Sequence, residues 1–129
     1  METAQQRSPL LELSNEMVRL YKQQLGRGPT KTRSNFAGRD AVLCTLEDSM
    51  TPAERSLVQM GEHQRLRDTR MFFQYASRKE FVEATERVMG RKVRAFVSGI
   101  DTETDVSCEL FYFEPLEDGS ENGSGDGNV

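Results

Sequence analysis

The chain has 129 residues, 36% of them hydrophobic and 29% charged, which suits one globular domain with a hydrophobic core. No apolar run approaches the roughly 20 residues of a membrane-spanning helix, and the N-terminus lacks the apolar region of a signal peptide, so we expect a cytoplasmic protein without membrane insertion. All 17 basic residues precede residue 117, whereas four of the 21 acidic residues follow residue 116, so the formal charge of −4 belongs to the C-terminal tail. This balance argues against a nucleic-acid binder, whose domain would carry a basic excess.

The first predicted element is a helix that ends at Leu25. Ser8 suits the N-cap and Pro9 the first helical position. Apolar residues then recur at spacings of three and four, as on one face of a helix: Leu10, Leu13, Met17, Leu20, Tyr21 and Leu25. Residues 1–7 are polar, and we expect them to be disordered.

The segment GRGPTK, residues 26–31, has the composition of a phosphate-binding loop. However, phosphate loops commonly follow a strand and open a helix, so that the helix N-terminal amides face the anion. This segment follows a helix instead, and the Walker spacing is absent. We interpret Gly26 as a left-handed helix C-cap and keep anion binding by the loop as the alternative.

Two strands with a short turn between them are predicted next. Residues 30–36 contain alternating and β-branched side chains, residues 37–40 have the length of a hairpin turn, and residues 41–47 are strongly apolar. Cys44 in the second strand is interpreted as a small buried hydrophobic side chain, and so is Cys108 further along the chain.

Residues 51–54, TPAE, are the clearest helix start in the chain, with threonine at the N-cap, proline in the first turn and glutamate three residues after the cap. Apolar side chains on one predicted helix face follow: Leu57, Val58, Leu66, Phe72, Phe73, Ala76, Ala84 and Val88.

An unbroken helix from residue 51 to residue 90 would be about 60 Å long, which exceeds what a four-stranded sheet can cover. The helix therefore either breaks, with Gly61 and Ser77 as candidate sites, or projects toward a partner. Residues 77–80, SRKE, have the form of a second capping box, which favours a break or bend there.

Two further strands are predicted at residues 93–98 and 106–113, with a loop between them. Residues 116–129 are rich in glycine, serine, asparagine and acid, so we expect a disordered acidic tail. The resulting order α-β-β-α-β-β, with a long helix that is either intact or broken, predicts a single α+β domain over residues 8–115. We expect an antiparallel four-stranded sheet packed against helices.

Both faces of the predicted sheet carry apolar side chains, whereas a half-solvated sheet would alternate apolar with polar residues. Along the fourth strand, Leu110 and Tyr112 point to one side and Phe111 and Phe113 to the other. We therefore expect a homodimer, or a higher oligomer, with Leu43, Phe111 and Phe113 in its interface. It would form through the second face of the sheet or through the projecting part of the long helix.

Seven basic residues are candidates for binding an anion or an acidic partner segment: Arg27, Lys31, Arg33, Arg39, Arg91, Lys92 and Arg94. They come from two short segments that would form one patch if the sheet brings them to one end or face. The alternative is two separate solvated edges.

The sequence contains no set of residues that indicates catalysis. The single histidine, His63, lies among polar residues, and we expect it on a solvated helix face. One histidine and two distant cysteines give no metal-ligand spacing, and no Ser-His-Asp set can be proposed. We expect no enzymatic activity, no metal and no cofactor.

Three segments resemble the small MpsC-like family of bacteria: LGRGPTK at 25–31, LEDSMTPAE at 46–54 and GRKVRAFVSGID…ELFYFEP at 90–115. The resemblance covers about residues 10–115. It implies an accessory role in a Na⁺-translocating, membrane-potential-generating system, beside membrane ion or bicarbonate transport, and it supplies no catalytic residues. The chain departs from the family at Gly99, where aspartate is usual, and at residues 34–35, where a more apolar strand is usual. The second departure indicates a more exposed edge strand.

We therefore expect a non-catalytic adaptor, assembly or regulatory module that acts by protein–protein interaction. Its expected partners are a second copy of the chain and another protein, such as a membrane transport component. The polar first strand could accept an extended peptide by β-addition. The alternative is a small-anion or nucleotide sensor that uses Arg27, Lys31 and Arg33.

Overall fold

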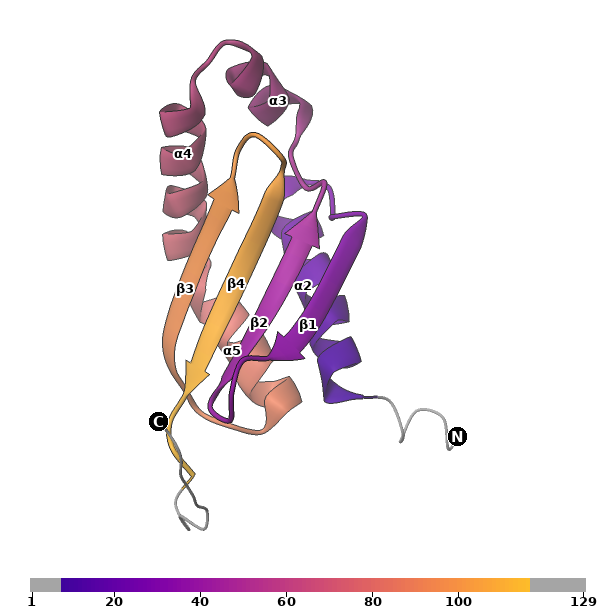
Figure 1. The fold of residues 1–129 in the computed structure, drawn as a ribbon, viewed down its shortest axis with the longest axis vertical. Coiled ribbons are helices and arrows are strands. Elements are labelled where there is room, and N and C mark those ends of the chain that lie inside the picture. Colours follow the sequence, from indigo (N-terminus) through magenta and orange to yellow (C-terminus); the bar gives the residue numbers. More distant parts are fainter. Residues whose placement is uncertain (1–7, 117–129) are drawn as a thin grey trace.

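Four strands form one antiparallel sheet in the order β1-β2-β4-β3 in the computed structural model, which describes residues 8–116 (Figure 1). The strands are β1 Lys31–Phe36, β2 Ala41–Glu47, β3 Val93–Asp101 and β4 Val106–Phe113. Each hairpin, β1–β2 and β3–β4, comes from neighbouring segments, and β2 pairs with β4 to join the hairpins. The α+β fold and the order of elements predicted from the sequence are confirmed.

Helices lie on one side of this sheet and at one of its ends. Within the described residues they are α2 Pro9–Leu25, α3 Pro52–Gln59, α4 His63–Ala76 and α5 Arg78–Met89. Helices α2 and α5 lie behind the sheet in Figure 1, whereas α3 extends past the end of the sheet and α4 runs beside the edge strand β3. The opposite face of the sheet is turned toward the viewer.

Helix α2 begins and ends where the sequence predicts. The Ser8 hydroxyl accepts a hydrogen bond from the Leu10 amide at 3.1 Å. Gly26 adopts a φ of 83°, and its amide donates to the Lys22 carbonyl oxygen at 2.9 Å. Glycine suits this left-handed position because it has no Cβ, so the C-cap interpretation of the GRGPTK segment is confirmed.

The long helical region is broken at both predicted sites. Gly61 has a φ of 78° between α3 and α4, and Ser77 separates α4 from α5. The two capping boxes have different outcomes. The Thr51 hydroxyl accepts from the Glu54 amide and the Glu54 carboxylate from the Thr51 amide, as predicted. The Ser77 hydroxyl instead donates to the Phe73 carbonyl oxygen one turn back, so no box forms there.

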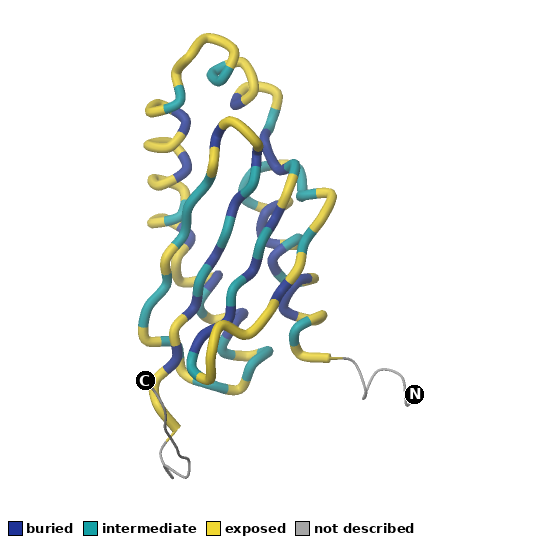
Figure 2. The backbone as a smooth tube through the Cα atoms, in the orientation of Figure 1, coloured by how far each residue is buried: buried dark blue, intermediate teal, exposed yellow. Residues whose placement is uncertain are grey.

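The hydrophobic core fills the space between the sheet and helices α2 and α5. Figure 2 shows buried positions alternating with exposed or half-buried ones along the strands. On β2 and β4 the core positions face one another across the sheet, as Val42 opposite Phe111 illustrates. The buried cluster is Leu13, Met17, Leu20, Tyr21, Val42, Cys44, Leu46, Phe81, Ala84, Phe111 and Phe113.

Two expectations about apolar side chains are wrong. Phe111 and Phe113 are 0% and 1% exposed and pack in the core, so neither is available at an interface. The pairing decides this, because Phe111 lies opposite the core residue Val42, whereas Leu43 lies opposite Leu110 and points to the other face. On α4, Phe72 is 69% exposed instead of buried, and Phe73 is 38% exposed where it lines a small cavity with Tyr21 and Phe81.

Strand β3 is longer than the sequence indicates. It continues through Gly99 and Ile100 to Asp101, because these residues pair with Cys108, Ser107 and Val106 of β4. The predicted disorder of residues 1–7 and 117–129 lies outside the described residues.

Candidate functional site

One face of the sheet has no helix over it within residues 8–116 (Figure 1). We call this the open face. Leu43, Leu110 and Val97 form a row across its three adjacent strands β2, β4 and β3. Val97 is 58% exposed, and Tyr112, on the same face of β4, is 42% exposed. The open face thus presents aliphatic and aromatic side chains to solvent.

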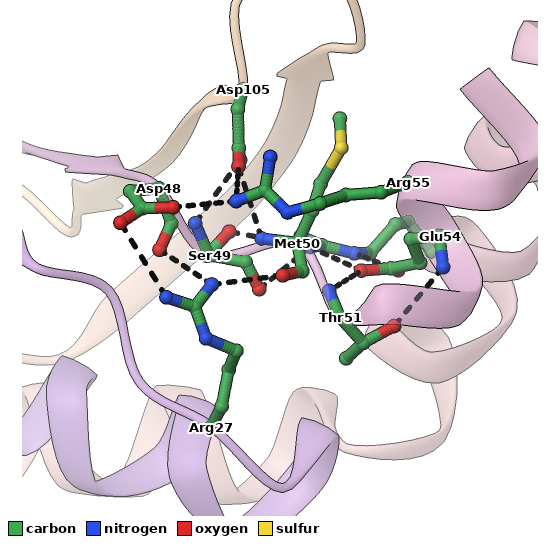
Figure 3. Close-up of polar contacts among 9 residues, drawn as sticks. Arg27, Asp48, Ser49, Met50, Thr51, Glu54, Arg55 and Asp105 are labelled. Atoms are coloured by element: carbon green, nitrogen blue, oxygen red, sulfur yellow. Dashed lines mark hydrogen bonds and ion pairs between the residues drawn. The ribbon is translucent and has the colours of Figure 1, made fainter. Parts of the chain in front are cut away.

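Four charged side chains connect the loops at one end of the sheet (Figure 3). Arg27, just after α2, donates through Nη1 to the carbonyl oxygens of Asp48 and Met50 at 2.9 and 2.8 Å. Its Nη2 lies 3.4 Å from the Asp48 carboxylate, and Arg55 of α3 approaches the same carboxylate at 2.6 Å. Hydrogen bonding by Arg27 lowers the pKa of Asp48.

Asp105 completes this connection from the β3–β4 turn. Its carboxylate accepts from the amides of Ser49 and Met50 at 3.1 and 3.2 Å, and its carbonyl oxygen accepts from the Asp48 amide at 3.0 Å. Asp48 and Asp105 both have positive φ values, 61° and 59°. We call Arg27, Asp48, Arg55 and Asp105 the loop junction. Sequence analysis missed it because its members come together only through the sheet.

The structure does not gather the seven predicted basic residues into one patch. Arg27 belongs to the loop junction, and Lys31 is exposed near it at the start of β1. Arg33 points to the open face, because it pairs with Thr45, which shares the face of Leu43. Arg94 stacks over the Tyr112 ring of the open face at 5.2 Å.

The remaining basic residues lie at the other end of the sheet. Arg91 donates to the carbonyl oxygen of Arg39 at 2.9 Å and to the Asp40 carboxylate at 2.7 Å, and it stacks over the Phe113 ring. Lys92 is exposed beside it. Arg91 therefore fastens the β1–β2 turn to the start of β3, and the basic residues are divided between both ends and the open face.

Glu109 is a fully buried carboxyl group in the middle of β4. Its Oε2 accepts a hydrogen bond from the Tyr21 hydroxyl at 2.5 Å. Within the described residues, no hydrogen bond reaches its Oε1 or the buried hydroxyls of Ser98 and Ser107. Burial raises the pKa of Glu109 to about 7, against the opposing effect of the nearby Ser98 and Tyr21 hydroxyls.

A buried ion pair links α4 to α3 close to Glu109. Arg70 donates to Glu54 through Nε at 2.6 Å and through Nη2 at 2.9 Å, and its guanidinium lies 5.9 Å from the centre of the Tyr21 ring. Burial would raise the pKa of Glu54, but hydrogen bonds from Arg70 and Thr51 outweigh it, and the pKa is lowered. A cavity of about 20 Å³ beside Tyr21, Arg70 and Glu109 has room for about one water molecule.

The family model described as "Na+-translocating membrane potential-generating system (MpsC)" matches residues 6–115. The chain belongs to the MpsC family. Neither the curated proteins nor the solved structures contain a match to it. None of the helices between residues 8 and 116 is both long and apolar enough to span a membrane.

The MpsC resemblance seen in the sequence is thereby confirmed, and its segments have identifiable positions in the fold. The GRGPTK segment supplies Arg27 and the LEDSMTPAE segment supplies Asp48 to the loop junction, Arg55 directly follows LEDSMTPAE, and the β3–β4 turn supplies Asp105. The hydrogen bonds and ion pairs of the loop junction hold together the segment after α2, the loop before α3 and the β3–β4 turn. The Ser34 hydroxyl of β1 is hydrogen-bonded to the Ser14 hydroxyl of α2 at 2.7 Å, and β1 is an edge strand.

The histidine and the cysteines have distinct surroundings. His63 lies on α4 and is half-buried, with its Nδ1 2.6 Å from the Thr102 hydroxyl, so it is less solvated than expected. Cys44 is buried as predicted, and burial raises the pKa of its thiol to about 12. Cys108 is only half-buried and lies on the open face, opposite Thr45.

Proposed function

We propose that this MpsC-family chain is a non-catalytic adaptor that helps to assemble or regulate the membrane-potential-generating system for which its family is named. It acts by binding another protein of that system through the open face of its sheet. The observation that carries the proposal is the row of Leu43, Leu110 and Val97, which no helix of the described chain covers.

Two physical arguments support a protein partner at the open face. An aliphatic or aromatic side chain left in water forgoes about 1.5–3 kcal/mol relative to burial, so a contiguous apolar patch marks an interaction site. The open face also has Arg33 and Arg94 near its borders, beside an uncharged centre. An apolar centre with a charged rim is typical of a protein–protein interface.

Nothing in the geometry of GRGPTK favours the alternative of an anion sensor. The Arg27 guanidinium is committed to two carbonyl oxygens and one carboxylate, so an anion would have to compete with those partners. The segment also follows the C-terminal end of α2, where the helix dipole repels an anion.

Quantitative affinity capture from the native host tests the adaptor proposal. We expect the unmodified chain to enrich at least one membrane protein of the potential-generating system. The Val97→Lys and Tyr112→Lys variants should no longer enrich this membrane protein, because each substitution places a charge in the apolar centre of the open face. Leu11→Lys on α2 is the matched control, since Leu11 is an exposed apolar residue on a different surface. Equal capture by all four chains would refute binding through the open face.

A further inference from the structure

We propose that α4 is the interface of a two-fold homodimer, in which the helices of two copies pack antiparallel. This inference goes beyond the proposed adaptor function and is compatible with it, because the dimer leaves the open face of each copy free for a different partner. The surface that suggests it is formed by Met71, Phe72 and Tyr75, which are 60%, 69% and 83% exposed. Met71 and Tyr75 also line a cleft of about 200 Å³ against Phe96 of β3, so the apolar surface continues onto the sheet edge.

The exposed residues form one stripe with a charge at each end. Asp68, Met71, Phe72 and Tyr75 follow one another at spacings of three, one and three, which places them on one face of α4. Lys79, four residues further, lies in the first turn of α5, just past the break at Ser77. Asp68 thus lies at one end of the stripe and Lys79 just beyond its other end. At this junction the Ser77 amide donates to the Phe73 carbonyl oxygen at 2.9 Å and the Phe81 amide to the Ser77 carbonyl oxygen at 3.2 Å, so helical hydrogen bonds keep Lys79 close to the end of α4.

This arrangement is complementary to itself. In a two-fold interface the same surface meets its own copy, so antiparallel helices pair residues at equal distances from the axis. An axis between residues 73 and 74 places Phe72 against the partner's Tyr75. The same axis places Asp68 against the partner's Lys79, and symmetry repeats both pairs. A second copy thus supplies the opposite charge at each end and an aromatic contact at the centre.

The charges in the stripe are available for this pairing. Asp68 is exposed, and within the described residues its carboxylate accepts only from the Gln64 amide, at 3.0 Å. The Lys79 side chain is 82% exposed, and its nearest carboxylate is that of Glu83 at 4.0 Å. Residues 8–116 contain equal numbers of basic and acidic residues, so the formal charge of −4 comes from residues 117–129 and not from the part of the chain that forms the interface.

Light scattering coupled to size exclusion tests the interface through a charge exchange. We expect the full chain to have twice its 14.7 kDa mass at tens of micromolar. Asp68→Lys and Lys79→Asp should each weaken the dimer about tenfold or more, because each change creates two like-charge pairs. The double variant should restore the dimer, because the exchanged charges again oppose one another. Phe72→Ser should dissociate it, whereas Leu11→Ser should not.

Three outcomes would contradict the proposed dimer. A 14.7 kDa mass for the unmodified chain at about 100 μM would do so, and so would a dimer that withstands Asp68→Lys and Phe72→Ser. A double variant that stays monomeric would also contradict the pairing. Circular dichroism of each variant excludes misfolding as the cause of a lower mass. A monomer that still captures its partner would refute only the dimer, and a dimer that captures nothing would refute only the adaptor function.

Discussion

Arg27 joins the end of α2 to the loop before α3, and its replacement shows what this junction contributes to stability. Arg27→Met keeps most of the side-chain stem but removes two hydrogen bonds to backbone carbonyls and the ion pair with Asp48. We expect the free energy of unfolding to fall by about 1–3 kcal/mol in urea titrations. Lys31→Met, at an exposed neighbouring position, should change it by less than about 0.5 kcal/mol. Equal losses for the two variants would contradict the structural role of Arg27.

Glu109 makes the stability of the protein depend on pH. Its pKa is about 7 in the folded chain and near 4.5 in an unfolded one, so between these values the folded state binds more protons. The stabilisation that Glu109 adds to the folded state is therefore complete below about pH 4.5, declines as the pH rises and is lost above about pH 7. Glu109→Gln should remove this decline, because the amide stays neutral and still accepts from the Tyr21 hydroxyl.

Urea titrations of both chains from pH 4.5 to pH 8 measure this effect. We expect the stability of Glu109→Gln relative to the unmodified chain to rise by up to about 3 kcal/mol across this range. Glu114→Gln, at an exposed position, serves as the control and should follow the unmodified chain. If the free energies of unfolding of Glu109→Gln and the unmodified chain differ by the same amount at every pH from 4.5 to 8, Glu109 does not titrate in this range.

At the residue scale, the sequence predicts local features, such as helix caps, that depend on residues close by in the chain. The caps at Ser8, Gly26 and Thr51 follow from the residues beside them, and all three are confirmed. Asp105 and Glu109 could not be predicted in the same way. Their partners come from distant segments of the chain, and the burial of Glu109 depends on the packing of α2 against the sheet.

The contact between α3 and α4 depends on the buried pair of Glu54 and Arg70. Arg70→Met should lower the free energy of unfolding by about 3–5 kcal/mol, because it leaves the Glu54 carboxylate buried without a counter-charge. Adding Glu54→Gln should recover part of this loss, since the neutral side chain costs less to bury and still accepts from the Thr51 amide. A double-mutant cycle in urea measures the coupling, and strictly additive losses would contradict a paired role.

At the scale of elements, local patterns predict where helices break but not which way their faces point. Gly61 and Ser77 both interrupt the helical region, as glycine and a serine-led segment indicate. The direction of Phe72 was mispredicted, because a helical wheel assumes one continuous axis and α4 is a separate helix. The faces of β4 were mispredicted for a similar reason, since alternation cannot tell which of two apolar faces meets the helices before the register with β2 is known.

For the whole molecule, the fold should be independent of residues 117–129. All the buried side chains of the described core lie between Leu13 and Phe113, and the family match ends at residue 115. A chain that ends at residue 116 should therefore melt within a few degrees of the full chain. A large fall in the melting temperature, measured by circular dichroism, would show that the tail docks on the domain.

Between residues 8 and 116, two apolar surfaces are not covered by other described residues: the open face and the stripe on α4. We therefore propose that both surfaces bind protein chains. An apolar second face of the sheet was predictable from the apolar residues on both sides of its strands. Which residues lie on that face, and the exposure of Phe72 on α4, were not predictable, because they follow from the sheet register and from the course of the broken helix.

Complementation in the native host tests the central claim most directly. The Na⁺-dependent membrane potential is measured in everted vesicles from a strain that lacks the chain and is supplied with a variant. We expect the unmodified chain and Leu11→Lys to restore the potential and Val97→Lys to fail at equal abundance, because only the last one places a charge on the open face. Full restoration by Val97→Lys and Tyr112→Lys would contradict the claim that the chain works through this surface.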